Sequence, residues 1–226
     1  MNRFSRKSLK TDEFVDAATD FGTWLEEHWR QVATWAAAVV IVALVVVAFI
    51  WNSQRTRREA AELLAQAQQR YRQATQEGAL DSQELNETLA MFQEVARRGG
   101  GSAVAEVARF YEGAALHRLG RLDDAIAAVE TVASGRETPK TLVGTAQTLL
   151  ATLYVEAGRA DEAATLLREA SEATDPAMDP AQALLQLGRL EMSRGNEQAA
   201  RAAWQQLVSR HPQAFEAGEA RRLLGG

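Results

Sequence analysis

The residue types that most often carry catalysis are sparse in this chain, and they follow no catalytic spacing. Its 226 residues include no cysteine and only three histidines, which are His28, His117 and His211. The lack of cysteine removes thiol nucleophiles and thiolate metal ligands. The histidines lie far apart in sequence, and no glycine-rich phosphate loop stands between a strand and a helix. We therefore predict that the chain is not an enzyme and that it holds no metal and no cofactor.

The balance of charge argues against a second class of function. The chain has 25 lysines and arginines against 30 aspartates and glutamates, which gives a net charge of −5 at pH 7. A protein that binds nucleic acid by neutralising phosphates needs an excess of basic residues. The chain is therefore not expected to bind nucleic acid.

The most apolar stretch covers residues 32–51, which contain one polar side chain, Thr34, and no charge. About 20 apolar residues span the hydrocarbon core of a bilayer as a helix. Valine, isoleucine, leucine and phenylalanine each favour insertion by about 0.3–0.6 kcal/mol, and a buried core helix is rarely this long and this apolar. We predict a transmembrane anchor, whose residues include Trp35, Val39, Leu44, Val46, Phe49 and Trp51.

The segment before the anchor, residues 1–31, distinguishes the anchor from a cleaved signal. A secretory signal has a short basic start, an apolar run of about 7–15 residues and a small-x-small cleavage site. Here a basic tip and six acidic residues precede the apolar run. Apolar residues spaced by three or four from Phe14 to Trp29 predict an amphipathic helix. Two interpretations stay open: this helix lies on the membrane surface, or it docks onto a protein partner.

After the anchor, residues 55–226 repeat one helical unit. Each unit has a turn glycine, at Gly120, Gly158 and Gly195, and an alanine five residues later. The alanine positions 125, 163 and 200, extended backwards to position 88, give intervals of 37, 38 and 37 residues. A larger apolar residue follows each position by four, so both lie on one helix face. We predict about four helical hairpins and a capping helix at 214–224.

The same residues resemble the tetratricopeptide repeat, in which small residues let two helices approach closely and proline ends the unit. Gly188, Gly195, Ala200 and Pro212 fit one unit of that pattern. The usual repeat has about 34 residues, so the extra residues fit in joints such as 136–140 and 174–180. The expected fold is all-α, with one N-terminal transmembrane helix followed by a tetratricopeptide-like solenoid of helical hairpins.

This resemblance implies a concave groove, lined by the first helix of each hairpin, that binds a protein partner. The expected lining residues are Phe110, Ala114, His117, Arg118, Thr148, Thr152, Glu156, Leu185, Arg189 and Met192. Relatives that clamp a carboxylate use Asn, Lys and Arg at these places, and this set has no Asn or Lys. His117, Arg118 and Arg189 could still meet an acidic ligand; the alternative is that they form a solvated face.

The whole layout also resembles the ancillary subunit of the SecYEG translocon. The resemblance covers the acidic amphipathic lead, the anchor that ends in Trp51-Asn52-Ser53, and the alanine-rich helix after it. It implies a single-pass protein of the bacterial inner membrane with a periplasmic repeat domain. The implied partners are the translocon, periplasmic chaperones or exported clients.

The arginines beside the anchor favour the opposite orientation. Arg55, Arg57 and Arg58 follow the anchor directly, whereas Arg30 alone lies close before it. Basic residues favour the cytoplasmic side, although long domains translocate with less regard for charge. We retain the periplasmic orientation as the expectation. The alternative function is an envelope scaffold that coordinates cell division or wall synthesis, and self-association into a homo-oligomer stays open.

Overall fold

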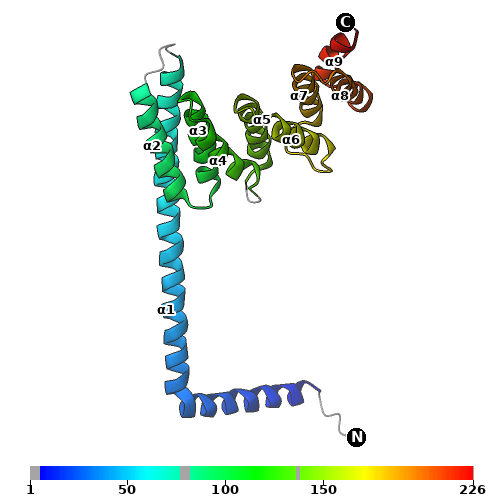
Figure 1. Ribbon diagram of the computed structural model, residues 1–226. Coiled ribbons are helices and arrows are strands. Elements are labelled where there is room, and N and C mark those ends of the chain that lie inside the picture. The colour runs from blue at the N-terminus through cyan, green and yellow to red at the C-terminus, as the bar shows by residue number, and fades with distance from the viewer. Residues whose placement is uncertain (1–5, 77–81, 136–137, 226) are drawn as a thin grey trace. The chain divides into compact units, whose positions relative to one another are not determined.

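The computed structural model of the chain describes residues 6–76, 82–135 and 138–225, and its regular elements there are all helices. Two compact units are present, Met1–Arg55 and Thr56–Gly226. The all-α class is therefore confirmed. In chain order (Figure 1) the helices are α1 (Arg6–Gln76), α2 (Ser82–Gly99), α3 (Ala103–Arg118), α4 (Leu122–Ala133), α5 (Lys140–Glu156), α6 (Ala160–Glu172), α7 (Pro180–Ser193), α8 (Glu197–Arg210) and α9 (Phe215–Gly225).

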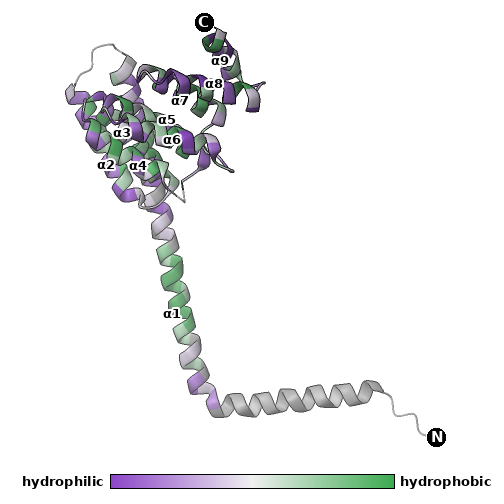
Figure 2. Cartoon of the chain, turned by 45° about the vertical axis from the view of Figure 1, so that its right-hand side comes forward, coloured by the Kyte–Doolittle hydropathy of each residue, from purple (hydrophilic) through white to green (hydrophobic). Residues whose placement is uncertain are grey.

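The first unit contains the apolar part of α1, which appears as a hydrophobic band in Figure 2. The six residues expected in the anchor are exposed, from 48% at Val46 to 75% at Trp35. Among the described residues, His28–Thr75 is the helix long and apolar enough to cross a membrane by length and composition, a criterion that a signal sequence also meets. The side chains of residues 1–27, which carry the predicted amphipathic face, lie outside the described part of the chain.

The second unit is a stack of packed helical hairpins typical of a tetratricopeptide solenoid. Helix α3 packs with α4, α5 with α6, and α7 with α8, and each helix from α2 onward also contacts the next one along the chain. The C-terminal part of α1 pairs with α2, because Ala60, Leu64 and Ala67 share a core cluster with Phe92 and Val95. Helix α9 covers the other end by packing on α7 and α8.

Burial follows the repeat register predicted from the sequence. Thr88, Ala125, Ala163 and Ala200 are each 0% exposed. The larger apolar residues four positions later are also buried, with at most 2% exposed: Phe92, Val129, Leu167 and Trp204. One face of each second helix therefore supplies a small and then a large residue to the core, one turn apart.

The glycine turns share one geometry. Gly120, Gly158 and Gly195 have φ values between 72° and 79°, a left-handed conformation that costs glycine little. The N–H of the residue after each glycine donates to a carbonyl five residues earlier: Arg121 to Leu116, Arg159 to Tyr154 and Asn196 to Glu191. This pattern is the Schellman motif, which ends a helix and satisfies its last carbonyls. The same helix-ending turn therefore joins the two helices in each of the hairpins α3–α4, α5–α6 and α7–α8.

Two further glycines allow the helices of a hairpin to touch. A Cβ atom at Gly188 in α7 would lie 2.1 Å from Nε1 of Trp204 in α8. A Cβ atom at Gly113 in α3 would lie 2.3 Å from Cγ2 of Val129 in α4. Both distances are far below van der Waals contact, so these positions require the absence of a side chain. This explains the small residue at Gly188, which the resemblance had marked, and the matching one at Gly113.

Candidate functional site

Two cavities lie along the face formed by the first helices of the hairpins. The larger, of about 820 Å³, is lined from α1, α3, α5, the joint before α7, and α7 itself. The smaller, of about 470 Å³, is lined mainly from α5 and α7. Thr152 of α5 lines both cavities. We call this pair of cavities the groove, and α5 is its central helix.

Helix α5 presents a row of threonines to the groove. Thr141, Thr145, Thr148 and Thr152 are spaced by four, three and four residues, which places them on one helix face, and all four line the larger cavity. Three of the hydroxyls donate to their own helix, to the carbonyls of Thr141, Gly144 and Thr148 at 2.8–3.2 Å. Each of these hydroxyls keeps lone pairs that can accept a hydrogen bond from a ligand.

The end of the larger cavity near α1 is aromatic. Tyr71 of α1 and Phe110 of α3 line it. Both rings contact Tyr111, with ring centres 5.8 Å and 5.6 Å away in edge-to-face geometry. Tyr71 also contacts Phe92 of α2 at 6.0 Å. Aromatic contacts of this kind hold rings in fixed positions, so this end of the groove is a preformed apolar surface.

Two basic side chains of the groove pair with carboxylates of neighbouring helices. Nε2 of His117 in α3 lies 2.7 Å from Oε2 of Glu156 in α5. Arg189 of α7 forms an ion pair with Glu219 of α9. Burial raises the pKa of the Tyr71 hydroxyl, while the positive charge of Arg118 and a hydrogen bond from it act in the opposite direction. Two of the three residues expected to meet an acidic ligand, His117 and Arg189, therefore already have partners within the fold.

Eight of the ten residues expected in the groove lie there. The larger cavity contains Phe110, Ala114, His117, Arg118, Thr148 and Thr152, and the smaller contains Glu156 and Arg189. Leu185 is instead 6% exposed in a core cluster with Trp204, because α7 is covered by both α8 and α9. Met192 is 40% exposed and lines neither cavity.

Sequence reasoning missed groove residues that come from outside the expected positions. Tyr71 belongs to α1, and Ala177, Met178 and Asp179 belong to the joint before α7. For two other groove residues the sequence held a signal. Thr141 and Thr145 are spaced from Thr148 and Thr152 so that all four lie on one helix face. The contribution of the joint carries no such signal, because it depends on how two hairpins are stacked.

The joint before α7 separates α5 from α7, which are the first helices of neighbouring hairpins. Helix α3 contacts α5, and α7 contacts α9, but within residues 138–225 no comparable backbone contact joins α5 to α7. A Cβ atom at Gly144 in α5 would lie 2.2 Å from the carbonyl oxygen of Ala177. Met178 is 2% exposed and shares a cluster with Ala151 of α5 and Leu187 of α7. The joint therefore lies between α5 and α7 and forms part of the groove wall.

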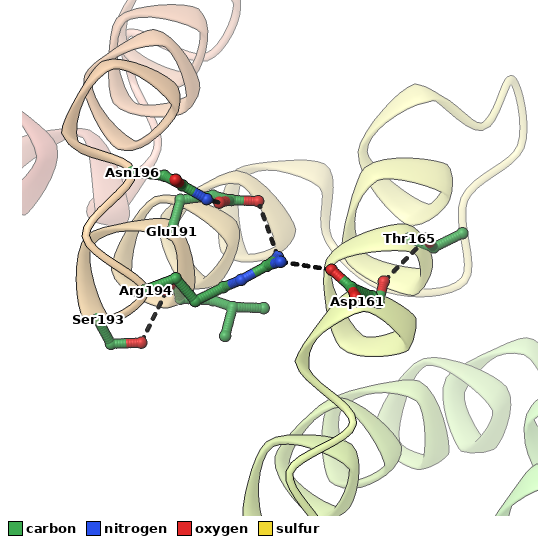
Figure 3. Close-up of polar contacts among 7 residues, drawn as sticks. Asp161, Thr165, Glu191, Ser193, Arg194 and Asn196 are labelled. Carbon is green, nitrogen blue, oxygen red and sulfur yellow. Dashed lines mark hydrogen bonds and ion pairs between the residues drawn. The ribbon is translucent and has the colours of Figure 1, made fainter.

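A polar cluster next to the smaller cavity ties the same two hairpins together (Figure 3). Arg194, after the end of α7, donates to Asp161 in the first turn of α6. The Arg194 guanidinium also lies 3.5 Å from Glu191, whose other oxygen accepts from Asn196 at 2.7 Å. Glu191 is 6% exposed and is therefore a buried carboxylate with two partners. These contacts are structural, since the groups are turned toward one another.

No group of three or more histidines, aspartates and glutamates that could hold a metal ion occurs among the residues that the structure describes. The groove offers hydrogen-bond acceptors on α5, amides on α7, and an aromatic surface beside α1.

Comparison with known proteins agrees with this fold. Residues 182–214, which run from α7 through α8, match the family model of the tetratricopeptide repeat. None of the curated proteins matches the chain. A solved tetratricopeptide repeat protein from Parabacteroides merdae ATCC 43184 is 19% identical with a TM-score of 0.52, over 74% of this chain and 59% of that one.

Two other solved structures are similar. BtubC (BKLC) from P. vanneervenii is 16% identical with a TM-score of 0.50, over 76% of this chain and 82% of that one. A double mutant of MamA from strain RS-1 is 19% identical with a TM-score of 0.50, over 74% of this chain and 82% of that one. At these identities the likeness concerns the fold alone.

Proposed function

Because this chain is a tetratricopeptide-repeat protein with a long apolar N-terminal helix, we propose that it is a membrane-anchored protein-interaction module. Residues 32–51 are the anchor, residues 1–31 are its lead, and residues 55–226 are the binding domain. The observation that carries the proposal is the groove, in which two cavities meet at Thr152 on the central helix.

The exposed apolar surface of α1 supports the anchor. Val39, Leu44 and Val45 are each more than 60% exposed, so no part of the described chain covers them. Leaving such a surface in water would be unfavourable, at about 25 cal/mol for each Å². A bilayer removes that surface from water, and Trp35 and Trp51 stand near the two ends of the run, where tryptophan favours the interface.

The partner that we propose is the bacterial protein-export machinery. The support is the likeness of the layout to the ancillary translocon subunit, which implies contact with the translocon and with periplasmic chaperones or clients. The repeat domain is then periplasmic, in spite of the arginines at positions 55, 57 and 58. An envelope scaffold for division or wall synthesis has the same architecture and is the second candidate.

Site-specific crosslinking in the native host tests the function. A photoreactive amino acid at Thr152, in the groove, should crosslink a defined partner protein. The same residue at Thr165 is the matched control, because Thr165 is an exposed threonine of α6 that also donates to its own helix. Translocon subunits or chaperones recovered from position 152 support the export role, and division or wall proteins support the scaffold. Equal crosslinking from both positions, or none from position 152, would contradict groove binding.

Fusion of reporters after residue 226 tests the orientation. Alkaline phosphatase folds to an active form outside the cytoplasm, so a periplasmic repeat domain should give an active fusion. A fluorescent protein that matures in the cytoplasm should be dark in the same position. The reverse result would place the repeats in the cytoplasm, as the local arginines favour.

A further inference from the structure

We propose that the groove selects an extended, uncharged polypeptide segment with an aromatic or large apolar side chain, and that it discriminates against acidic segments. This inference rests on the proposed function, because it names the chemistry of the ligand at the same site. It departs from the sequence expectation, in which His117, Arg118 and Arg189 were candidates for an acidic ligand.

Most charged side chains that line the two cavities have partners within the fold. His117 and Glu156 bind one another and Arg189 binds Glu219, while the positive charge of the exposed Arg118 acts on the Tyr71 hydroxyl. Asp179 accepts from the N–H of Ala181 at 2.7 Å and so caps α7. The two arginines are offset by the three carboxylates of Glu156, Asp179 and Glu219. An acidic ligand would meet this excess of carboxylates, or would have to displace Glu156 or Glu219 from its partner, and both are unfavourable.

Neutral polar side chains also line the groove, on α5 and on α7. The threonine hydroxyls of α5 accept hydrogen bonds, and Gln182 and Gln186 of α7 face the cavities with amides that both donate and accept. An extended peptide backbone carries both N–H donors and C=O acceptors that require partners. The two sides of the groove therefore match a backbone without requiring a charge.

The groove also has an apolar surface at one end and extends along the first helices of the hairpins. Tyr71 and Phe110 offer rings held by their contacts with Tyr111. Leu149 and Met178 extend the apolar lining of the larger cavity. Because the joint keeps α5 and α7 apart, the groove continues past Thr152 into the smaller cavity. An extended segment of about ten residues reaches about 33–36 Å, which lets it follow several helices of the row.

The test is direct binding to the full chain in lipid nanodiscs, with empty nanodiscs as the blank. The probe is a peptide of about ten residues, built from Ser, Asn, Gln and Thr around one Phe, with an uncharged fluorophore. Two sibling peptides replace two of the neutral residues by Asp or by Lys. Fluorescence anisotropy should show that both charged siblings bind at least about tenfold more weakly than the neutral peptide.

Two groove variants and one control variant assign the effect to the groove. Thr145→Arg places a cation on the exposed threonine row and should weaken the neutral peptide at least about tenfold, whereas Thr165→Arg on α6 should leave it unchanged. Glu156→Gln with Glu219→Gln removes the carboxylates from His117 and Arg189. That double variant should raise the affinity of the Asp peptide about tenfold. Circular dichroism of each variant checks that the helices remain.

Several results would overturn the proposal. Equal or tighter binding of the Asp peptide to the unmodified protein would show that the groove prefers acidic segments. Equal losses in Thr165→Arg and Thr145→Arg would show that the peptide binds elsewhere, and no binding of any peptide would refute a groove for extended segments. In each of these cases a partner crosslinked from Thr152 would still support the proposed function, so the two failures are distinguishable.

Discussion

Val45 in the apolar part of α1 is 62% exposed, whereas Val129 in α4 is 0% exposed. The same contrast separates Trp35, which is 75% exposed, from Trp204, which is 2% exposed. In α1 the apolar residues run without interruption, so they cover the whole circumference of the helix. In the repeats they recur every three or four residues and alternate with charges, so each helix has one apolar face. The spacing of apolar residues, more than their type, therefore determines whether a helix packs on protein or needs another apolar environment.

The largest effect is expected from charges in the exposed apolar helix. Val45→Arg with Val46→Arg should cost about 5–7 kcal/mol of membrane insertion, since each arginine costs about 2.5–3.5 kcal/mol at the centre of a spanning helix. The double variant should leave the membrane fraction and appear in the soluble fraction after cell lysis.

The matched control adds the same charge to the packed region. Ala127→Arg with Thr131→Arg changes two exposed residues of α4 and should leave the protein in the membrane fraction. Alkali-resistant recovery of the Val45 and Val46 double variant at the level of the unmodified protein would remove the basis for treating α1 as an anchor.

A smaller effect should separate two glycines of the packed region. Gly188→Ala places a Cβ atom 2.1 Å from Trp204, and overpacking of this kind typically costs about 1–3 kcal/mol. Gly218→Ala in α9 meets nothing within 4 Å and should stabilise the protein by up to about 1 kcal/mol, because alanine favours helix. Thermal unfolding followed by circular dichroism should shift in opposite directions, by about 2–4 °C for each kcal/mol. A Gly188→Ala variant that melts at or above the temperature of the unmodified protein would show that α7 and α8 are not in close contact.

The smallest effect concerns a side-chain hydrogen bond that joins two neighbouring hairpins. In the described apolar part of α1 no side chain forms such a bond to another helix. The Tyr154 hydroxyl in α5 donates to Glu130 in α4 at 2.5 Å, and the Arg159 guanidinium lies 4.7 Å from the ring centre. Burial and then the hydrogen bond to Glu130 raise the pKa of Tyr154 to about 12. Tyr154→Phe should cost about 0.5–1.5 kcal/mol of unfolding free energy at neutral pH.

The pH dependence of this cost has a definite sign. The folded protein holds the Tyr154 proton more tightly than the unfolded chain, whose tyrosines titrate at about pH 10. The contribution of the group is therefore fully present below about pH 10 and is lost as the pH rises towards 12. Chemical denaturation of both proteins at about pH 8 and about pH 11 should give a smaller difference at the higher pH. An unchanged difference would mean that Tyr154 titrates normally.

The repeat architecture could be predicted because its determinants are local. A turn glycine, an alanine five residues later and a larger apolar residue after that lie within one hairpin. Their interval therefore marked the buried positions at Ala125, Ala163 and Ala200, which are 0% exposed. The three Schellman turns follow from the same glycines, because a positive φ is a property of one residue and its neighbours.

The groove was predicted less completely because its determinants come from different hairpins. Glu219 lies 30 residues after Arg189, and Glu156 lies 39 residues after His117, so neither pairing has a sequence signal. Leu185 was expected on the groove surface, but α9 folds back onto α7 and helps to bury it. Stacking geometry thus decides which polar groups are available to a ligand.

The first helices of the hairpins are held to their neighbours in two different ways. Polar contacts brace α3 against α5 through His117, and α7 against α9 through Arg189. The pair α5 and α7 has no such brace on the groove side, although Arg194 still tethers the end of α7 to Asp161 of α6. On the groove side the link between α5 and α7 is therefore the joint, whose Ala177 carbonyl lies against Gly144 and whose Met178 packs with Ala151 and Leu187.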